Sequence, residues 1–308
     1  MDSYQDEPPR LDQAIAERDT LLGLCYRLLG SLSDAEDAVQ ETYIRWYRLS
    51  DEQREEVLSP RGWLIKTASR ISLDILGSAR VRREHYVGDW LPEPVPGAGA
   101  WTSRPADASA GDPADRISLD ESVSMALLVV LESMTPAERV AFVLHDVFGY
   151  TFREVGEIVG RTPEACRQLA SSARRRAPRQ ARRVSRASHD AVVRSFKDAW
   201  QRGNVESMIA LLDPGAKAVT DGGGLVSAPV APILGAPAVA DLFLDVLHRE
   251  PEIAVRTETV NGRLGLVAHL GDRIMAVITI SMNATGIHEI WVVRNPEKLR
   301  AWHPDTNI

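Results

Sequence analysis

The sequence predicts a multidomain protein: two all-α domains, the second a helix-turn-helix, joined by a flexible linker and followed by an α+β domain. A chain of 308 residues is too long for one typical hydrophobic core. Apolar residues recur at helical spacing within 10–83 and again within 118–183, and after residue 187 the pattern changes to helices followed by alternating strands. Residues 84–117 are rich in Pro, Gly and Ala and lack periodicity, so they are expected to be the linker. The third domain is then 187–308.

The first block is expected to hold three helices. The first carries apolar residues at helical spacing until Gly30 ends it. The second is expected to start at a capping box formed by Ser33 and Glu36. The third runs from Pro60, in the first turn, to about Ser78. The block therefore reads as a small helical domain.

The second block ends in a helix-turn-helix pattern. Thr151 and Glu154 form a capping box, and Gly160 ends the helix that follows. Thr162 and Pro163 then supply a capping side chain and a first-turn proline for the next helix. Two helices joined by so short a turn are typical of a DNA-binding unit.

This second helix opens a basic stretch. The chain has 36 Lys and Arg against 43 Asp and Glu, a net charge of −7, yet residues 161–186 hold nine arginines and one acid. An isolated charge run is usually a solvated face, but the reversal of sign together with the two-helix pattern favours DNA. Helical geometry puts Ala165, Leu169 and Ala173 on the buried face. The opposite arc carries Glu164, Arg167, Gln168, Ser171, Arg174 and Arg175.

These residue types fit the reading of a major groove. Arg can bridge guanine or phosphate, Gln can pair with adenine, and the small Ala170 and Ser171 would let the helix enter the groove. Further along the chain, four arginines are expected to meet backbone phosphate: Arg176, Arg179, Arg182 and Arg183.

The third domain is expected to begin with helices at 188–201 and 205–212, a Gly-rich loop at 221–224 and a further helix, VADLFLDVLHRE. Strands follow, beginning with a hairpin whose turn is Asn261-Gly262. Two more strands are IMAVITISM and IHEIWVVR. Helices followed by a meander suggest helices packed on one face of a curved sheet.

Taken in order, DAEDAVQETYIRWYR, PRGWLIKTASRISLDIL and the late helix-turn-helix resemble the extracytoplasmic-function sigma factors of bacterial RNA polymerase, over residues 10 to about 178. The resemblance implies that residues 10–83 are sigma region 2, which binds the polymerase clamp and recognises the minus-10 element. It implies that residues 118–183 are sigma region 4, which recognises the minus-35 element. Core RNA polymerase and promoter DNA, both double-stranded and melted, are the expected partners.

The resemblance also assigns roles to residues. An acidic helix face would dock on the clamp of the largest polymerase subunit: Asp34, Glu36, Asp37, Gln40 and Glu41. A second set would contact the minus-10 element and its separated strands: Trp63, Lys66, Thr67, Arg70, Arg80, Arg82 and Arg83. A solvated helix face is the alternative for the first set, and a core aromatic is the alternative for Trp63. Gly77 departs from the basic residue expected in LGSAR.

Three further motifs resemble the sigma-factor group that carries a fused, cone-shaped SnoaL-like domain: WLPEP at 90–94, DGGG at 221–224 and NPEKL at 295–299. Leu225 stands where that group usually has lysine, and Glu297 where it has aspartate. We expect this domain to control the sigma domains in cis, with DGGG gripping the linker and NPEKL making a separate contact that restrains activity. The residues concerned are Trp90, Leu91, Pro92, Asp221, Gly222, Gly223, Gly224, Asn295, Pro296, Lys298 and Leu299. The alternative for DGGG is an ordinary turn.

Other functions remain open at this point. The cone could be a small-molecule cyclase or isomerase using Asp221, His248, His269, His288 or Glu289, but no pair has a spacing that identifies acid–base work. A small-molecule sensor is another possibility, since the cone is a ready pocket. The whole chain could instead be a one-component DNA-binding regulator that works without polymerase.

The rest of the sequence predicts neither a metal nor a cofactor, and no catalytic residue. Cys25 and Cys166 are two isolated cysteines in helical patterns, which make neither a disulfide framework nor a metal site. The longest aliphatic run, Met125 to Leu131, is far short of a membrane span, and the acidic N-terminus shows no secretory signal. A cytoplasmic protein without a membrane partner is expected.

Overall fold

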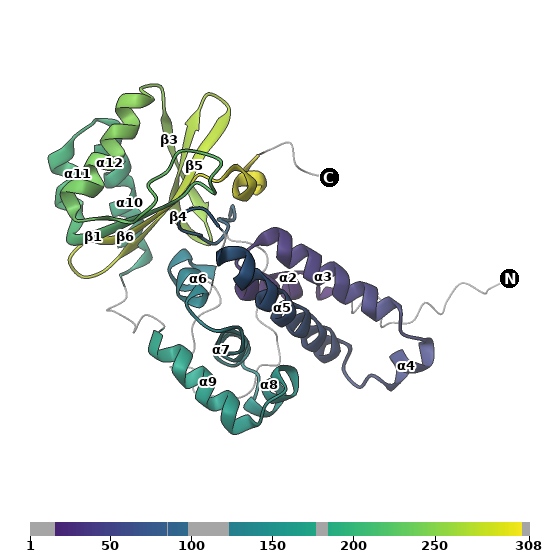
Figure 1. Cartoon of the computed structure of the whole chain (residues 1–308). Coiled ribbons are helices and arrows are strands. Elements are labelled where there is room, and N and C mark those ends of the chain that lie inside the picture. The colour runs from purple at the N-terminus through teal and green to yellow at the C-terminus, as the bar shows by residue number, and fades with distance from the viewer. Residues whose placement is uncertain (1–15, 85, 98–122, 177–183, 304–308) are drawn as a thin grey trace. The chain divides into compact units, whose positions relative to one another are not determined.

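The computed structural model describes residues 16–84, 86–97, 123–176 and 184–303. Of these, 16–81 and 130–176 form a compact helical unit, and the remainder form a C-terminal α+β unit. Figure 1 shows both, with the helices of the first in purple, blue and teal and the sheet of the second in green and yellow. The fold class predicted from the sequence is confirmed for each unit.

The helical unit begins with helices α2 (Arg18–Leu29), α3 (Leu32–Tyr47), α4 (Asp51–Glu56) and α5 (Pro60–Glu84). Gly30 ends α2 with a left-handed φ of 69°, as expected. The capping residue of α3 is Ser31, whose hydroxyl accepts from the amide of Asp34, so the prediction of Ser33 was wrong by two residues. Helix α5 runs past Ser78, because nothing in ARVRRE breaks a helix.

The second part of this unit follows the predicted order. It begins in the last turn of α6 (Met125–Glu132), whose first residues belong to the C-terminal unit. It continues with α7 (Pro136–Phe142), the π-helical turn η4 (Val143–Val147), α8 (Phe152–Val159) and α9 (Pro163–Arg176). The capping box of Thr151 and Glu154 forms, and Gly160 ends α8 in the left-handed region. Helices α8 and α9 pack on α7, which gives a helix-turn-helix on a helical base.

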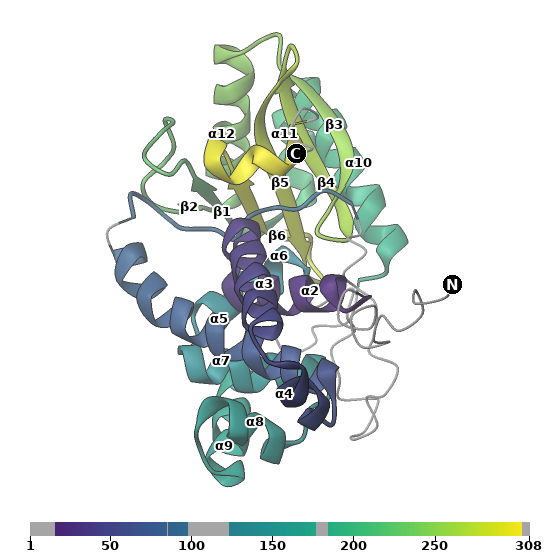
Figure 2. The same ribbon diagram turned by 90° about the vertical axis from the view of Figure 1, so that its right-hand side faces the viewer.

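The C-terminal unit is a curved sheet with three helices on one face (Figures 1 and 2). The helices are α10 (Arg186–Gln201), α11 (Val205–Leu211) and α12 (Ala236–Arg249). The strands are β1 (Leu212–Asp221), β2 (Ile233–Leu234), β3 (Ala254–Val260), β4 (Arg263–Leu270), β5 (Arg273–Met282) and β6 (Ile287–Val293). The 3-10 turn η5 (Pro296–Trp302) follows the last strand.

Sequence reasoning missed strand β1. The sheet order is β2-β1-β6-β5-β4-β3, and β1 pairs with β6 in parallel while the other neighbours are antiparallel. The Pro214-Gly215 pair interrupts the strand pattern, and no element was predicted between the helix at 205–212 and the loop at 221–224. Asp221 is therefore the last residue of a strand beside β6, not part of a free loop.

The sheet separates two hydrophobic cores, because side chains alternate between its faces. The core under the helices is built around Trp200, Phe243 and Ile278. The other core includes Val219, Trp291 and Trp302 from the C-terminal domain, and Leu91 and Met125 from segments near the two ends of the predicted linker. The second core is therefore completed by chain from outside the expected third domain.

Candidate functional site

Part of the predicted linker is bound to the outer face of the sheet. Within 86–97, Leu91, Pro92 and Val95 are buried, and Pro96 forms a β-bridge with Val260. The backbone amide of Asn261 donates to the Val95 carbonyl, while the Asn261 side chain accepts from the Val95 amide. The segment therefore runs as an extra strand-like edge along β3, and this stretch does not behave as the flexible linker that was expected.

At the centre of this contact is the buried ion pair of Asp221 and Lys298. Lys298 Nζ lies 2.7 Å from Asp221 Oδ2 and 2.6 Å from the Leu91 carbonyl oxygen. The Asp221 carboxylate also accepts from the Leu91 amide at 2.9 Å, the Tyr86 hydroxyl at 2.6 Å and the Gly223 amide at 3.0 Å. Each buried charge is thus paired and hydrogen-bonded, which is the condition for tolerating charge in a core.

Aromatic rings complete the site around the ammonium group. Lys298 Nζ lies 4.0 Å from the centroid of the Trp90 ring and 4.9 Å from that of Tyr86. The Trp302 indole donates to the Pro94 carbonyl at 2.8 Å. Burial and the hydrogen bond to Asp221 both raise the pKa of the Tyr86 phenol. The WLPEP segment is therefore held by cation–π contacts as well as by hydrogen bonds.

The DGGG and NPEKL motifs form a single site. The amide of Asn295 donates to the Tyr86 hydroxyl at 2.8 Å, and the backbone amides of Arg294 and Asn295 both donate to the Asp221 carbonyl. Gly223 has a φ of 63°, and a Cβ there would collide with the Asn295 amide group. The prediction that NPEKL makes a separate contact was wrong, because Lys298 and Asp221 bind one another and the same stretch of linker.

Several residues of this site escaped sequence reasoning. Tyr86 lies four residues before Trp90 and carries no motif signal, and Asn261 was interpreted only as a hairpin turn residue. Trp302 lies just after the NPEKL motif, and its aromatic side chain was the only sign in the sequence that it could contribute to this site. Pro296, Gly224 and Leu225 are exposed.

In the helical unit, the acidic face of α3 is exposed as expected. Ala35, Val39, Thr42 and Trp46 are buried on the opposite side. Among the proposed docking residues, Glu36, Asp37 and Gln40 are exposed and Asp34 and Glu41 are half-buried. Glu41 forms an ion pair with Arg45 at 2.8 Å. The face is thus available to a partner, although one of its carboxylates already has a local counter-ion.

The residues expected to meet melted DNA lie on α5. Trp63 is half-buried and packs on Trp46, with ring centroids 5.2 Å apart. Lys66 Nζ lies 3.0 Å from a carboxylate oxygen of Glu157, and Arg70 donates to the Glu157 backbone carbonyl at 2.7 Å. Glu157 is on α8, so a helix of the helix-turn-helix occupies two residues of the proposed minus-10 surface. Arg80, Arg82 and Arg83 lie in the last turns of α5, where side chains are not described.

Helix α9 exposes the predicted recognition residues. All six are exposed: Glu164, Arg167, Gln168, Ser171, Arg174 and Arg175. The buried face is Cys166, Ala170 and Ala173, so the expectation that Ala165 and Leu169 are buried and that Ala170 faces a groove was wrong. Because α9 packs on both α7 and α8, its buried stripe is rotated from the one that periodicity favoured.

Two arginines of α9 already have partners within the helical unit. Arg174 Nε lies 2.6 Å from an oxygen of the buried Asp146, and Arg176 lies 2.8 Å from Glu138. The Arg167 guanidinium stacks over the Phe152 ring at 5.3 Å. The expected phosphate contacts of Arg179, Arg182 and Arg183 fall outside the described residues.

Comparisons with known proteins agree with these two units. Residues 15–82 match the family model for sigma-70 region 2, and residues 124–176 match that for sigma-70 region 4. The ECF RNA polymerase sigma factor SigJ of Mycobacterium tuberculosis is 36% identical over 296 residues, which cover 92% of this chain and 91% of the relative.

The chain belongs to the ECF sigma factors. It therefore acts as an RNA polymerase sigma factor in promoter-specific initiation of transcription. The probable ECF sigma factor SigI of M. tuberculosis is 34% identical over 92% of both chains. The crystal structure of M. tuberculosis SigJ superposes with a TM-score of 0.72 at 31% identity, covering 94% of this chain and 98% of that one.

The acid–base candidates named from the sequence do not lie in the pocket of the C-terminal domain. Asp221 lies on the outer face of the sheet in an ion pair, and none of the other four candidates lines the pocket under the helices: His248, His269, His288 and Glu289. Cys25 and Cys166 are buried free thiols, and burial raises the pKa of Cys25 to about 12. Within the described ranges, no group of three His, Cys, Asp or Glu residues could hold a metal, and no helix is long and apolar enough to cross a membrane.

Proposed function

We propose that the C-terminal domain controls this ECF sigma factor in cis by holding the chain that joins sigma regions 2 and 4. The observation that carries the proposal is the buried contact of Lys298 with both Asp221 and the Leu91 carbonyl. It joins the third domain to WLPEP through groups that are costly to leave unpaired. The linker segment is thus a cis ligand of this domain.

The domain also contacts the chain just before sigma region 4. Met125 belongs to the core on the linker side of the sheet, and Ala126 and Val129 pack against that core. The domain therefore binds the segment that leaves region 2 and the segment that enters region 4. Because both segments belong to the same chain, their local concentration is about millimolar and weak contacts stay occupied. Holding both limits how far apart the two DNA-reading regions can lie.

We further propose the roles of the exposed surfaces. The acidic face of α3 docks on the clamp of the largest polymerase subunit, α5 contacts the melted minus-10 element, and α9 reads the minus-35 element in the major groove. The domains are 10–83, 118–183 and 187–308, with the linker at 84–117 between the first two. Their place of action is the cytoplasm, where polymerase and promoter DNA are found.

The contact of α5 with α8 supports a further regulatory step. Glu157 neutralises Lys66, and its backbone carbonyl engages Arg70. DNA must compete with Glu157 for the Lys66 ammonium group, so separation of these two helices favours promoter binding. The proposed order is release of the linker contact, separation of the two helices and then engagement of both promoter elements.

Transcription in vitro tests this proposal. Core polymerase is mixed with full-length protein, with a form ending before Asn295 and with a form ending after Arg186. The shorter deletion removes Lys298 but leaves strand β6 intact, so it should raise transcription. The longer deletion also removes the sheet face that holds Met125, so the two sigma regions lose every contact that fixes their spacing and transcription should fall. Equal transcription and promoter choice by all three forms would rule out control in cis.

A further inference from the structure

A pocket lies under the helical face of the C-terminal sheet, on the opposite side from the linker site. It encloses about 70 Å³ and opens to solvent on one side, so part of a bound molecule would lie in its mouth. Its walls come from helices α10 and α12 and strands β1, β4, β5 and β6, so the rigid part of the fold forms it.

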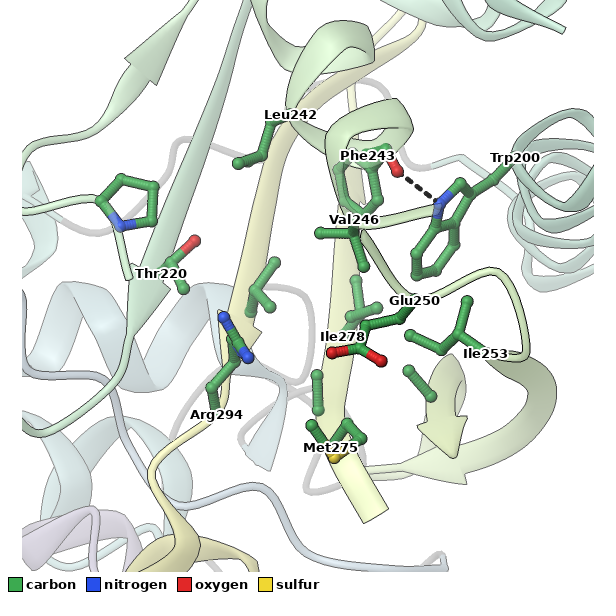
Figure 3. A pocket seen from close by; sticks show the side chains of 14 residues that line it. Trp200, Thr220, Leu242, Phe243, Val246, Glu250, Ile253, Met275, Ile278 and Arg294 are labelled. Atoms are coloured by element: carbon green, nitrogen blue, oxygen red, sulfur yellow. Dashed lines mark hydrogen bonds between the residues drawn. The ribbon is translucent and has the colours of Figure 1, made fainter. Parts of the chain in front are cut away.

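The pocket wall is almost entirely apolar. Trp200 and Phe243 pack edge to face with centroids 4.9 Å apart, and Trp200 donates its indole N–H to the Phe243 carbonyl. This hydrogen bond satisfies the polar atom of the ring and leaves its apolar surface to the pocket (Figure 3). The aliphatic lining includes Ile253 and Ile278. A flat ring or short hydrocarbon chain suits such a wall.

Polar groups are confined to Thr220, Glu250 and Arg294. Figure 3 shows the ends of Glu250 and Arg294 projecting toward each other. Arg294 donates to the Ser227 carbonyl at 2.5 Å, and in the part of the chain that the structure describes no hydrogen bond to the Glu250 carboxylate is found. Burial lowers the pKa of the Arg294 guanidinium, and the Glu250 charge acts against that shift. The pocket thus carries one cation and one anion. Guanidinium N–H groups can donate to a ligand, and the carboxylate can accept from it.

From this arrangement we infer that the pocket binds an uncharged, ring-containing small molecule that carries a hydrogen-bond acceptor and a donor at one end. The acceptor meets Arg294, and the donor meets Glu250. An anionic ligand is attracted by Arg294 but repelled by Glu250, and a cationic ligand has the opposite difficulty, so the opposed charges favour a head group without net charge. A primary amide has both functions on one carbonyl carbon and is the simplest probe of this class.

The pocket and the linker site share two strands. Thr220 faces the pocket while the adjacent Asp221 faces the linker, and the backbone amide of Arg294 donates to the Asp221 carbonyl. A ligand that engages Arg294 therefore acts on a residue that helps to position the linker site. This second step rests on the proposed function, whereas binding itself does not.

Ligand-observed NMR on the full chain tests binding, with cinnamamide and cinnamate as a matched pair that differs only in amide against carboxylate. We expect cinnamamide to bind about tenfold more tightly than cinnamate. Glu250→Gln removes the anion and should reduce or reverse that preference. Glu252→Gln changes an exposed neighbouring acid outside the pocket and should leave it unchanged. Ala276→Phe fills the pocket and should abolish binding.

Three results would overturn the inference. The first is no binding of cinnamamide, benzamide or 2-naphthamide at the highest soluble concentrations. The second is equal binding of amide and carboxylate that Glu250→Gln does not alter. The third is binding that survives Ala276→Phe in a protein whose hydrogen-exchange pattern shows an intact sheet. Coupling is read separately, as a several-fold change in exchange of the Leu91 amide on saturation with cinnamamide; bound ligand with unchanged exchange would overturn the coupling alone.

Discussion

The Lys298 ammonium and the Asp221 carboxylate lie 2.7 Å apart with side chains only 7% and 0% exposed, and both also bind the backbone of Leu91. This ion pair therefore joins the DGGG motif to the NPEKL motif, and it binds both of them to WLPEP. Removing either partner leaves a buried charge beside the linker, so the pair is the most sensitive point of the proposed control.

Lys298→Met should release the linker. An unpaired Asp221 carboxylate in this core costs about 3–5 kcal/mol, which exceeds what the remaining linker contacts can offset. Hydrogen–deuterium exchange of the 86–97 segment should rise strongly, with a smaller rise in β5. The double variant Asp221→Asn with Lys298→Met should be less perturbed than Lys298→Met alone. Lys197→Met, on α10, is the control, and equal protection of the segment in both single variants would refute the assignment.

Glu157→Gln should strengthen binding of single-stranded DNA by the full chain. The substitution keeps the shape of the side chain but frees Lys66 for a phosphate, and one regained contact should steepen the salt dependence by about 0.7 of a slope unit. Fluorescence anisotropy with a mixed-sequence oligonucleotide at several salt concentrations measures this. Glu206→Gln makes the same charge change on the exposed surface of α11. If both variants gain affinity equally, net charge rather than the Lys66 contact is responsible.

Arg167→Lys should relax base preference in the upstream promoter element. Lysine keeps the charge but loses the bidentate geometry, so the cognate base should lose about 1–3 kcal/mol of discrimination while affinity for other sequences changes little. Selection from a randomised duplex library measures the preference. Arg194→Lys, on the exposed face of α10, is the matched control. Loss of affinity for every sequence to the same degree would show that Arg167 contacts only phosphate.

Replacing Arg179, Arg182 and Arg183 together should instead weaken binding to all sequences. Each lost phosphate contact should reduce the salt slope on duplex DNA by roughly one unit. The measurement is the same anisotropy titration with duplex DNA. A change of base preference with an unchanged slope would mean that these residues read bases.

The helix-turn-helix should lose stability in acid through Glu138. Burial alone would raise the pKa of this carboxyl, but hydrogen bonds from Thr135 and Ser172 and the Arg176 charge lower it to about 2. The stabilisation is fully present above the ordinary pKa and is lost as pH falls from about 4.5 toward 2, with a magnitude on the order of 2–3 kcal/mol. Hydrogen–deuterium exchange of the backbone amides of α7 and α9, corrected for the pH dependence of intrinsic exchange rates, should report this loss of stability. Glu138→Gln should flatten the acid dependence, and an unchanged pH profile would contradict the assignment.

Local signals in the sequence predicted much of the fold. The capping box at Thr151, the left-handed Gly160 and the Asn261-Gly262 hairpin each depend on neighbouring residues, and all three form. Strand β1 could not be predicted in the same way, because its partner β6 lies about 70 residues further along the chain and Pro214-Gly215 obscures its pattern.

The site was predictable only in part. Three motifs indicated the linker contact. That they meet around Lys298 depends on the parallel pairing of β1 with β6, which no short sequence pattern predicts. Tyr86 and Asn261 have no signal of their own. Nothing in the sequence distinguishes Glu157 from other acids on an amphipathic helix, and its contact with Lys66 depends on how α8 packs against α5.

The most direct test of control in cis is promoter-specific transcription by core polymerase with Leu91→Asp compared to the parent protein. The substitution places a carboxylate next to Asp221 and should expel the linker while leaving every proposed DNA and polymerase contact intact. The account predicts a several-fold rise in transcript level, matched by Lys298→Met and absent in Lys197→Met. Transcript levels and promoter choice identical to the parent, in a variant whose 86–97 segment exchanges freely, would contradict it.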